Sequence, residues 1–145
     1  MKAPRCGHRS HCPISYSLDL IGDRWTLLVL RDLIIQRKRS FREFLASEEG
    51  IASNILTARL KLLEACGMVS RRPDPASGRQ VVYEPTPKAL ALLPAMLELA
   101  RWGATYDAAT AAPRALVRRI ERDREALVRE IRSGHDVTKG KRHAS

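Results

Sequence analysis

One stretch of the chain alternates polar and apolar side chains with the period of a helix. Asn54, Thr57, Ala58 and Lys61 fall on one face, because residues three or four positions apart are neighbours on a helix. The opposite edge is apolar and holds Leu56, Leu60 and Leu63. The Asn carboxamide matches the major-groove edge of adenine, and Thr can bond to a base or contact a thymine methyl. The pattern therefore predicts a helix that can contact base edges in duplex DNA.

Four arginines outside that helix could hold the DNA backbone. Two of them lie in the first of two strand-like segments and a third directly precedes the second, whereas Arg39 ends the basic stretch before a short helix. Guanidinium groups pair with phosphate oxygens and also enter narrow minor grooves. The predicted DNA contacts are Arg39, Ser53, Asn54, Thr57, Ala58, Lys61, Arg71, Arg72 and Arg79. The plainer interpretation is that these polar residues only face solvent.

Cys12 is the candidate reactive thiol. It precedes Pro13 at the expected start of a helix, where the helix dipole favours a thiolate. We hypothesise that its oxidation or alkylation tunes DNA affinity. The alternative is that Cys12 packs at a dimer seam as a small apolar residue.

Cys6, His8, His11 and Cys12 place four metal-binding side chains within seven positions. Their spacing matches no standard zinc site, so we expect neither a metal nor any other cofactor. Three cysteines are too few for a disulfide framework, and reduced thiols are the default expectation. Cys66 is expected to be a small buried residue.

Catalytic motifs are absent from the sequence. It has no glycine-rich phosphate loop, no nucleophile elbow and no His-Glu zinc motif. The four histidines lie in the expected flexible ends, whereas catalysis needs rigid positioning. An enzyme is therefore not expected.

Capping signals divide the chain into elements that would position these side chains. Asp23 and Ser53 can cap helices, Ser40 and Glu43 form a capping box, and Gly67 suits a left-handed helix end. Pro94 should kink the next helix or mark its restart. The expected helices cover about 13–21, 24–35, 41–47, 53–66, 87–107 and 114–132, and the expected strands 68–72 and 80–84.

This order of elements is that of a winged helix-turn-helix: mainly α with a small β-hairpin and long C-terminal dimerisation helices. Trp25 and Trp102 are expected in the core. Apolar residues of the last helix, Leu116, Ile120, Leu127 and Ile131, either extend a dimer seam or pack on their own domain. We predict a flexible basic arm over 1–11, a DNA-binding and dimerisation domain over 12–107, a linker and extra helix over 108–132, and a disordered basic tail over 133–145.

Composition agrees with a nucleic-acid partner. The 145 residues include 26 Lys and Arg against 16 Asp and Glu, a formal charge of +10, and such a basic surface attracts polyanions. No apolar run is long enough to span a bilayer, and no signal peptide is evident. We expect a cytoplasmic protein without membrane contact.

Several blocks resemble the HxlR-type transcription regulators. The matching stretches are Cys12-Pro13, Leu20 to Leu33, Arg39 to Phe44, Gly50 to Thr57, Leu60 to Val69 and Val82 to Thr86, with Trp102 beyond them. The resemblance implies a homodimeric winged helix that represses or activates transcription through contacts from its recognition helix and wing. It also implies that a cysteine at the place of Cys12 can sense electrophiles or oxidants. The helix over 114–132 lies beyond the resemblance.

Two functions stay open at this point. The first is a sequence-specific regulator that binds an inverted-repeat operator as a homodimer. The second is a winged-helix module for protein contact or non-specific nucleic-acid binding. The sequence does not identify a small-molecule effector.

Overall fold

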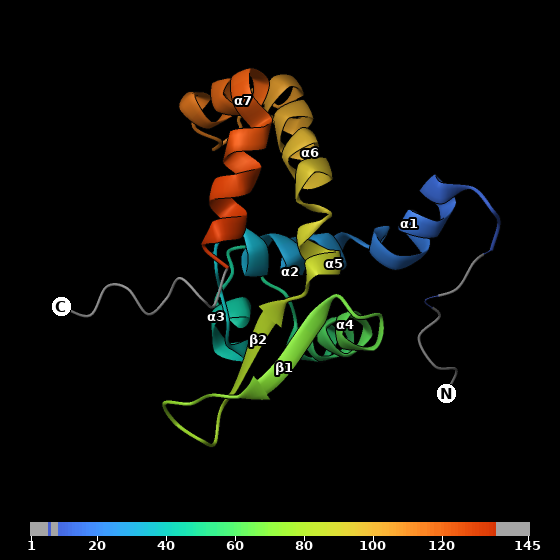
Figure 1. The fold of residues 1–145 in the computed structure, drawn as a ribbon, viewed down its shortest axis with the longest axis vertical. Helices are drawn as coiled ribbons and strands as arrows, with labels where there is room; N and C mark the ends of the chain where they lie inside the picture. The colour runs from blue at the N-terminus through green and yellow to red at the C-terminus, as the bar shows by residue number, and fades with distance from the viewer. Residues whose placement is uncertain (1–5, 7–8, 136–145) are drawn as a thin grey trace. The chain divides into compact units, whose positions relative to one another are not determined.

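The computed structural model describes residue 6 and residues 9–135. The chain divides into two compact units, residues 1–89 and residues 90–145. The first unit holds four helices, a β-hairpin and most of the short helix α5: α1 (Pro13–Ile21), α2 (Arg24–Ile34), α3 (Phe41–Leu45), α4 (Ser53–Ala65), β1 (Val69–Pro73), β2 (Val81–Pro85) and α5 (Pro87–Leu90). The second holds α6 (Leu93–Tyr106) and α7 (Arg114–Ser133). The architecture, mainly α with one small hairpin, confirms the predicted fold class (Figure 1).

Local capping explains where α2 and α3 begin. The Asp23 carboxylate accepts from the Trp25 amide at 2.9 Å, and Ser40 and Glu43 form a complete capping box. Both caps were predicted. Ser53, in contrast, does not cap α4, because Ala52 occupies the N-cap position and Ser53 is the first helical residue.

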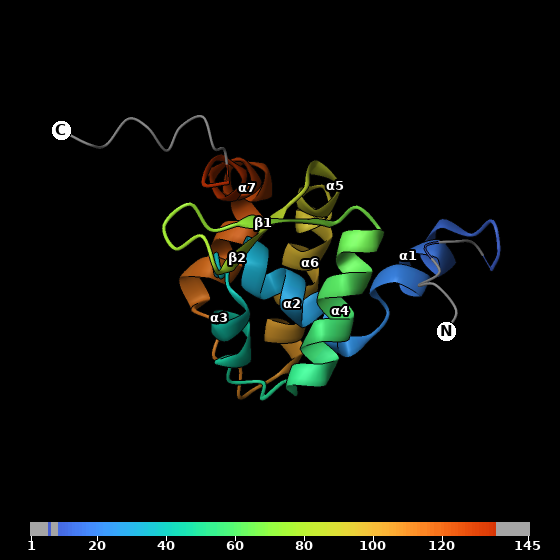
Figure 2. The same cartoon turned by 90° about the horizontal axis from the view of Figure 1, so that it is seen from below.

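Helix α2 is the centre of the first unit. Figure 2 shows it between α3 and α4, and it packs on both α4 and β2. Leu30, Leu33 and Ile34 are fully buried, as expected for a helix with apolar residues around much of its circumference. This core fixes the helix-turn-helix formed by α3 and α4.

The hairpin pairs β1 with β2 in antiparallel register, with Arg71 opposite Tyr83 and Ser70 opposite Glu84. Gly67 ends α4 with a φ of +71°, a left-handed conformation that glycine adopts without steric cost. The Met68 amide then bonds to the Leu63 carbonyl at 2.8 Å. The chain passes from α4 into β1 through this compact, predicted turn.

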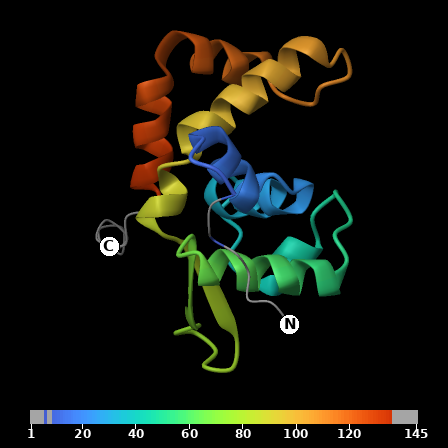
Figure 3. The ribbon, with the colours of Figure 1, turned by 90° about the vertical axis from the view of Figure 1, so that its right-hand side faces the viewer.

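In the second unit, α6 and α7 form a helical hairpin (Figure 3). Pro94 lies in the first turn of α6, so it marks a restart after α5, one of the two predicted outcomes. Helix α7 bends at Asp123, whose φ of −152° and ψ of 69° are not helical. Ile120 and Leu127 are buried within the single chain, which favours the alternative in which this helix packs on its own chain.

Two further expectations are wrong. Cys6 and Cys66 form a disulfide across 60 positions of sequence, a separation at which no local pattern indicates pairing. Cys66 is nevertheless buried, as predicted. Trp102 is 61% exposed rather than part of the core.

Residues 136–145 of the predicted tail, and residues 1–5, 7 and 8 of the predicted arm, lie outside the described part. Within that part, no helix is long and apolar enough to cross a membrane.

Candidate nucleic-acid interface

The outer face of α4 is formed by the residues that the sequence indicated. Leu56, Leu60 and Leu63 are buried, which confirms the apolar edge. The opposite face is exposed and carries Ser53, Asn54, Thr57, Ala58 and Lys61. The Thr57 hydroxyl donates to the Ser53 carbonyl at 2.8 Å, so its oxygen keeps acceptor capacity. The polar face therefore presents an amide, a hydroxyl and an ammonium group to a ligand.

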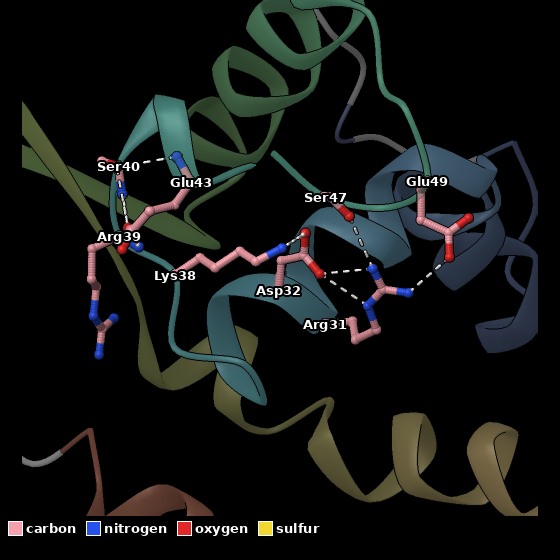
Figure 4. A network of polar contacts seen from close by, with 8 residues as sticks. All are labelled: Arg31, Asp32, Lys38, Arg39, Ser40, Glu43, Ser47 and Glu49. Atoms are coloured by element: carbon pink, nitrogen blue, oxygen red, sulfur yellow. Dashed lines mark hydrogen bonds and ion pairs between the residues drawn. The ribbon is translucent and has the colours of Figure 1, made fainter. Parts of the chain in front are cut away.

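A network of charged groups holds the turn between α3 and α4 against α2 (Figure 4). The nearly buried Asp32 carboxylate accepts from Arg31 at 2.8 Å and from Lys38 at 3.0 Å. Arg31 also bonds to Glu49 at 3.1 Å, and the Ser47 hydroxyl lies 3.4 Å from the same guanidinium. Burial of a charge is tolerated when it is paired in this way. The network fixes the entry to α4 relative to the core.

Arg39 is held differently from the other predicted contacts. Its amide donates to Glu43 at 2.7 Å, and its carbonyl accepts from the Tyr83 amide at 2.8 Å. Its side chain is half-buried, and this burial lowers the pKa of the Arg39 guanidinium. Arg39 thus joins the cap of α3 to β2, and its predicted phosphate contact stays a prediction.

The arginines of the hairpin are exposed, but they are not equivalent. Arg72 pairs with Glu84 across the hairpin at 2.7 Å, and this hydrogen bond raises its pKa. Part of its charge is thereby neutralised. Arg71 and Arg79 have exposed guanidinium groups that form no ion pair with a carboxylate among the described residues, so they are better suited than Arg72 to contact phosphate.

The face of α4 and the hairpin are continuous. A recess of about 180 Å³ is lined by Thr57, Lys61 and Arg71, among others. The next recess, of about 330 Å³, is lined by Arg71, Arg72 and Arg79. The structure therefore brings five predicted contacts to adjoining surfaces, whereas Asn54, Ala58, Ser53 and Arg39 line neither recess.

Sequence reasoning missed the partner of Arg59, which lies in α4. Arg59 pairs with Asp23 at 2.9 Å, so the cap of α2 is tied to α4. In the sequence this pair is only one acid and one base 36 positions apart, and nothing distinguishes it from many other such pairs.

Among the described residues, no three His, Cys, Asp or Glu side chains gather as metal ligands.

Comparison with known proteins decides the family. The model of the HxlR-like helix-turn-helix family matches residues 20–111. The chain belongs to this family. Among its relatives, the HTH-type transcriptional regulator BH0655 of Halalkalibacterium halodurans is 36% identical over 91 residues, 63% of this chain and 80% of the relative. The regulator sll1512 of Synechocystis is 30% identical over 105 residues, 72% of this chain and 77% of the relative.

Solved structures of similar proteins share the winged-helix fold. The redox regulator HypR in its oxidized form is 31% identical with a TM-score of 0.60, covering 66% of this chain and 98% of HypR. The reduced transcriptional regulator YodB of Bacillus subtilis is 28% identical with a TM-score of 0.56, covering 70% of this chain and 99% of YodB. In this HxlR-type regulator, α7 lies beyond the matched residues 20–111.

Proposed function

We propose that this HxlR-type regulator binds duplex DNA sequence-specifically, with α4 in the major groove and the β1–β2 hairpin on the backbone. The observation that carries the proposal is the continuity of the polar face of α4 with the basic hairpin, through recesses that share Arg71. In this arrangement Asn54 and Thr57 contact bases, whereas Lys61, Arg71 and Arg79 contact phosphates. Binding to the chromosome implies a cytoplasmic location.

Exposed apolar residues support a homodimer. On α1, Ile14 and Leu18 are 70% and 60% exposed, and on α6 Leu99, Trp102 and Tyr106 are also largely exposed. The rings of Trp102 and Tyr106 lie 5.4 Å apart. Aromatic residues of this kind are enriched at protein interfaces. We propose that each of these helices pairs with a second copy of the chain.

A symmetric dimer predicts the form of its operator. The two copies of α4 would enter successive major grooves about 34 Å apart, so the binding site would be an inverted repeat. The sign of regulation follows from where such a repeat lies relative to a promoter.

Selection of bound duplexes from a random pool tests this proposal. We expect an inverted repeat to be enriched, and the double variant Asn54→Ala and Thr57→Ala to lose that enrichment while it remains folded. The control is Gln36→Ala, a change at an exposed polar residue that follows α2. Equal retention of all sequences by the native protein would instead favour the alternative, a module for protein contact or non-specific nucleic-acid binding.

We further propose that Cys12 makes DNA binding responsive to electrophiles. Cys12 is an exposed, free thiol at the N-cap of α1, the helix whose exposed Ile14 and Leu18 are proposed for the dimer. A bulky adduct at this position would disturb pairing of α1. Alkylation of Cys12 in a Cys6→Ser and Cys66→Ser background should therefore weaken operator binding, and unchanged affinity after complete alkylation would reject the idea.

A further inference from the structure

Cys6 and Cys66 join two parts of the first unit that are far apart in sequence. Their Cα atoms lie 5.7 Å apart, within the range that a disulfide requires. Cys66 is 5% exposed and is the C-cap residue of α4, whereas Cys6 is half-buried and precedes α1. The bond therefore connects the segment before α1 to the end of the helix proposed to enter the major groove.

The position of Cys66 is fixed by its neighbours. Its amide donates to the Leu62 carbonyl at 2.9 Å, and its carbonyl accepts from Lys88 at 2.9 Å. The carbonyl of Gly67 accepts from the Thr86 hydroxyl at 2.6 Å. Cys66 thus lies at the junction where α4 passes into β1, the two elements of the proposed DNA interface.

The segment between Cys6 and α1 is held at a second point. Arg9 pairs with Asp19 of α1 at 3.3 Å, and the Cys12 amide donates to Ser10 at 3.3 Å. Formation of the disulfide closes a loop from residue 6 to residue 66, which includes α1, α2, α3 and α4. Closing such a loop removes conformations from the unfolded chain and stabilises the folded unit.

We propose that Cys6 and Cys66 form a reversible intrachain disulfide that stabilises the α4–β1 junction, so that the oxidised protein binds DNA more tightly than the dithiol form. The inference rests on the proposed DNA-binding function. The compartment that holds the chromosome is kept reducing, and disulfides that form in such a compartment are usually transient or redox-sensing. A Cys6–Cys66 pair at the end of α4 would therefore form when the protein is oxidised and break when it is reduced.

The reaction is exchange with a low-molecular-weight disulfide. The more exposed Cys6 thiolate attacks one sulfur of that disulfide, forms a mixed disulfide and releases one thiolate. Cys66 then gives up its proton and attacks the Cys6 sulfur, which forms the Cys6–Cys66 bond and releases the second thiolate. Two protein thiols are oxidised, and one small disulfide is reduced to two thiols.

The test uses the full chain equilibrated in glutathione buffers of defined potential. Peptide mapping should show a Cys6–Cys66 link in the native protein and in Cys12→Ser, but not in Cys6→Ser or Cys66→Ala. Oxidation should raise the melting temperature of the native protein by about 10 °C and leave that of Cys6→Ser unchanged. Since Cys6 is half-buried, Cys6→Ser keeps the test valid if the buried Cys66 variant fails to fold.

DNA affinity supplies the second readout. With a duplex of about 30 base pairs carrying the selected repeat, or of mixed sequence at low salt, the oxidised protein should bind at least about fivefold more tightly. By linkage the same duplex should lower the midpoint potential of the Cys6–Cys66 pair by about 20 mV.

Absence of the Cys6–Cys66 disulfide at every potential, or a disulfide that changes neither the melting temperature nor the DNA affinity, would overturn the inference. Loss of DNA binding in both forms, with the link and the melting shift present, would reject the proposed function and the effect on DNA but retain the stabilising bond.

Discussion

At the scale of single residues, the structure distinguishes exposed side chains that are proposed to contact DNA from side chains that are bonded to neighbouring protein groups. Asn54 and Thr57 are exposed on α4, whereas Asp32 and Glu43 are tied to neighbouring protein groups. Substitutions at Asp32 and Glu43 should therefore change the stability of the fold, which can be measured without DNA.

Glu43 should make part of the stability depend on pH. Hydrogen bonds from the amides of Arg39 and Ser40, at 2.7 and 2.8 Å, lower the pKa of its carboxyl group. The ionised form therefore stabilises the folded protein above the ordinary pKa of Glu, and this stabilisation is lost as the pH falls through the lowered folded value. Glu43→Gln should lower the free energy of unfolding by about 0.5–1 kcal/mol at pH 7, and the difference should vanish toward pH 3 in urea titrations. A difference that grows in acid would contradict this account.

Thr26 is a fully buried hydroxyl in α2, and its oxygen has no hydrogen-bond partner among the described residues. A buried polar group without a partner costs about 1–3 kcal/mol. Thr26→Val, which preserves shape, should therefore raise the free energy of unfolding by about 1 kcal/mol. Thr57→Val, at an exposed position of α4, is the control and should change it little. A marked loss of stability in Thr26→Val would show that the hydroxyl is satisfied.

At the scale of elements, helix ends were predictable and long-range partners were not. Asp23, the Ser40–Glu43 capping box and Gly67 each act within four residues, so their positions in the sequence reveal them. The pairing of Arg59 with Asp23 and the disulfide depend on the packed fold, which no local pattern encodes. The bend at Asp123 was also missed, because no proline or glycine marks it.

Gly50 in the turn between α3 and α4 has a φ of +69°, and a Cβ placed there would meet nothing within 4 Å. The cost of Gly50→Ala is therefore purely conformational, about 1 kcal/mol. Gly50→Asn should cost less, since Asn tolerates the left-handed region better. Thermal unfolding of the two variants gives the comparison, and equal melting temperatures for them would contradict the conformational explanation.

At the scale of the whole molecule, the net charge of +10 would make the proposed DNA binding depend on phosphate neutralisation as well as on base contacts. Affinity should fall linearly on logarithmic axes as salt increases. Replacement of both Arg71 and Arg79 by Ala should reduce the magnitude of that slope by about 2. Arg118→Ala together with Arg122→Ala, a matched loss of two exposed charges on α7, should leave it nearly unchanged. A slope that drops equally in both double variants would mean that the hairpin has no special role.

The exposed face of α6 should determine the oligomeric state. Trp102→Glu places a charge on a residue that is 61% exposed in the protomer, so the protomer should fold normally. Sedimentation should show a shift from dimer to monomer, because a charge at an apolar interface is left without a partner. Glu121→Ala, on an exposed position of α7, should sediment like the native protein.

The expectation of Trp102 in the core was wrong for a related reason. A periodic apolar pattern shows that a residue avoids water, but it does not distinguish burial within one chain from burial against another. The sequence could therefore predict which helices are amphipathic, whereas the structure shows which apolar faces are covered within each unit.

Helix α7 covers one side of α6 through Ile120, Leu127 and Val128, and it lies beyond the part of the chain that the family shares. A cell that carries several related regulators risks mixed pairs between their similar helices. A side of α6 that is already occupied by its own chain is closed to such relatives. If α6 pairs two copies of the chain as proposed, α7 would limit which related regulators can form mixed pairs with this one.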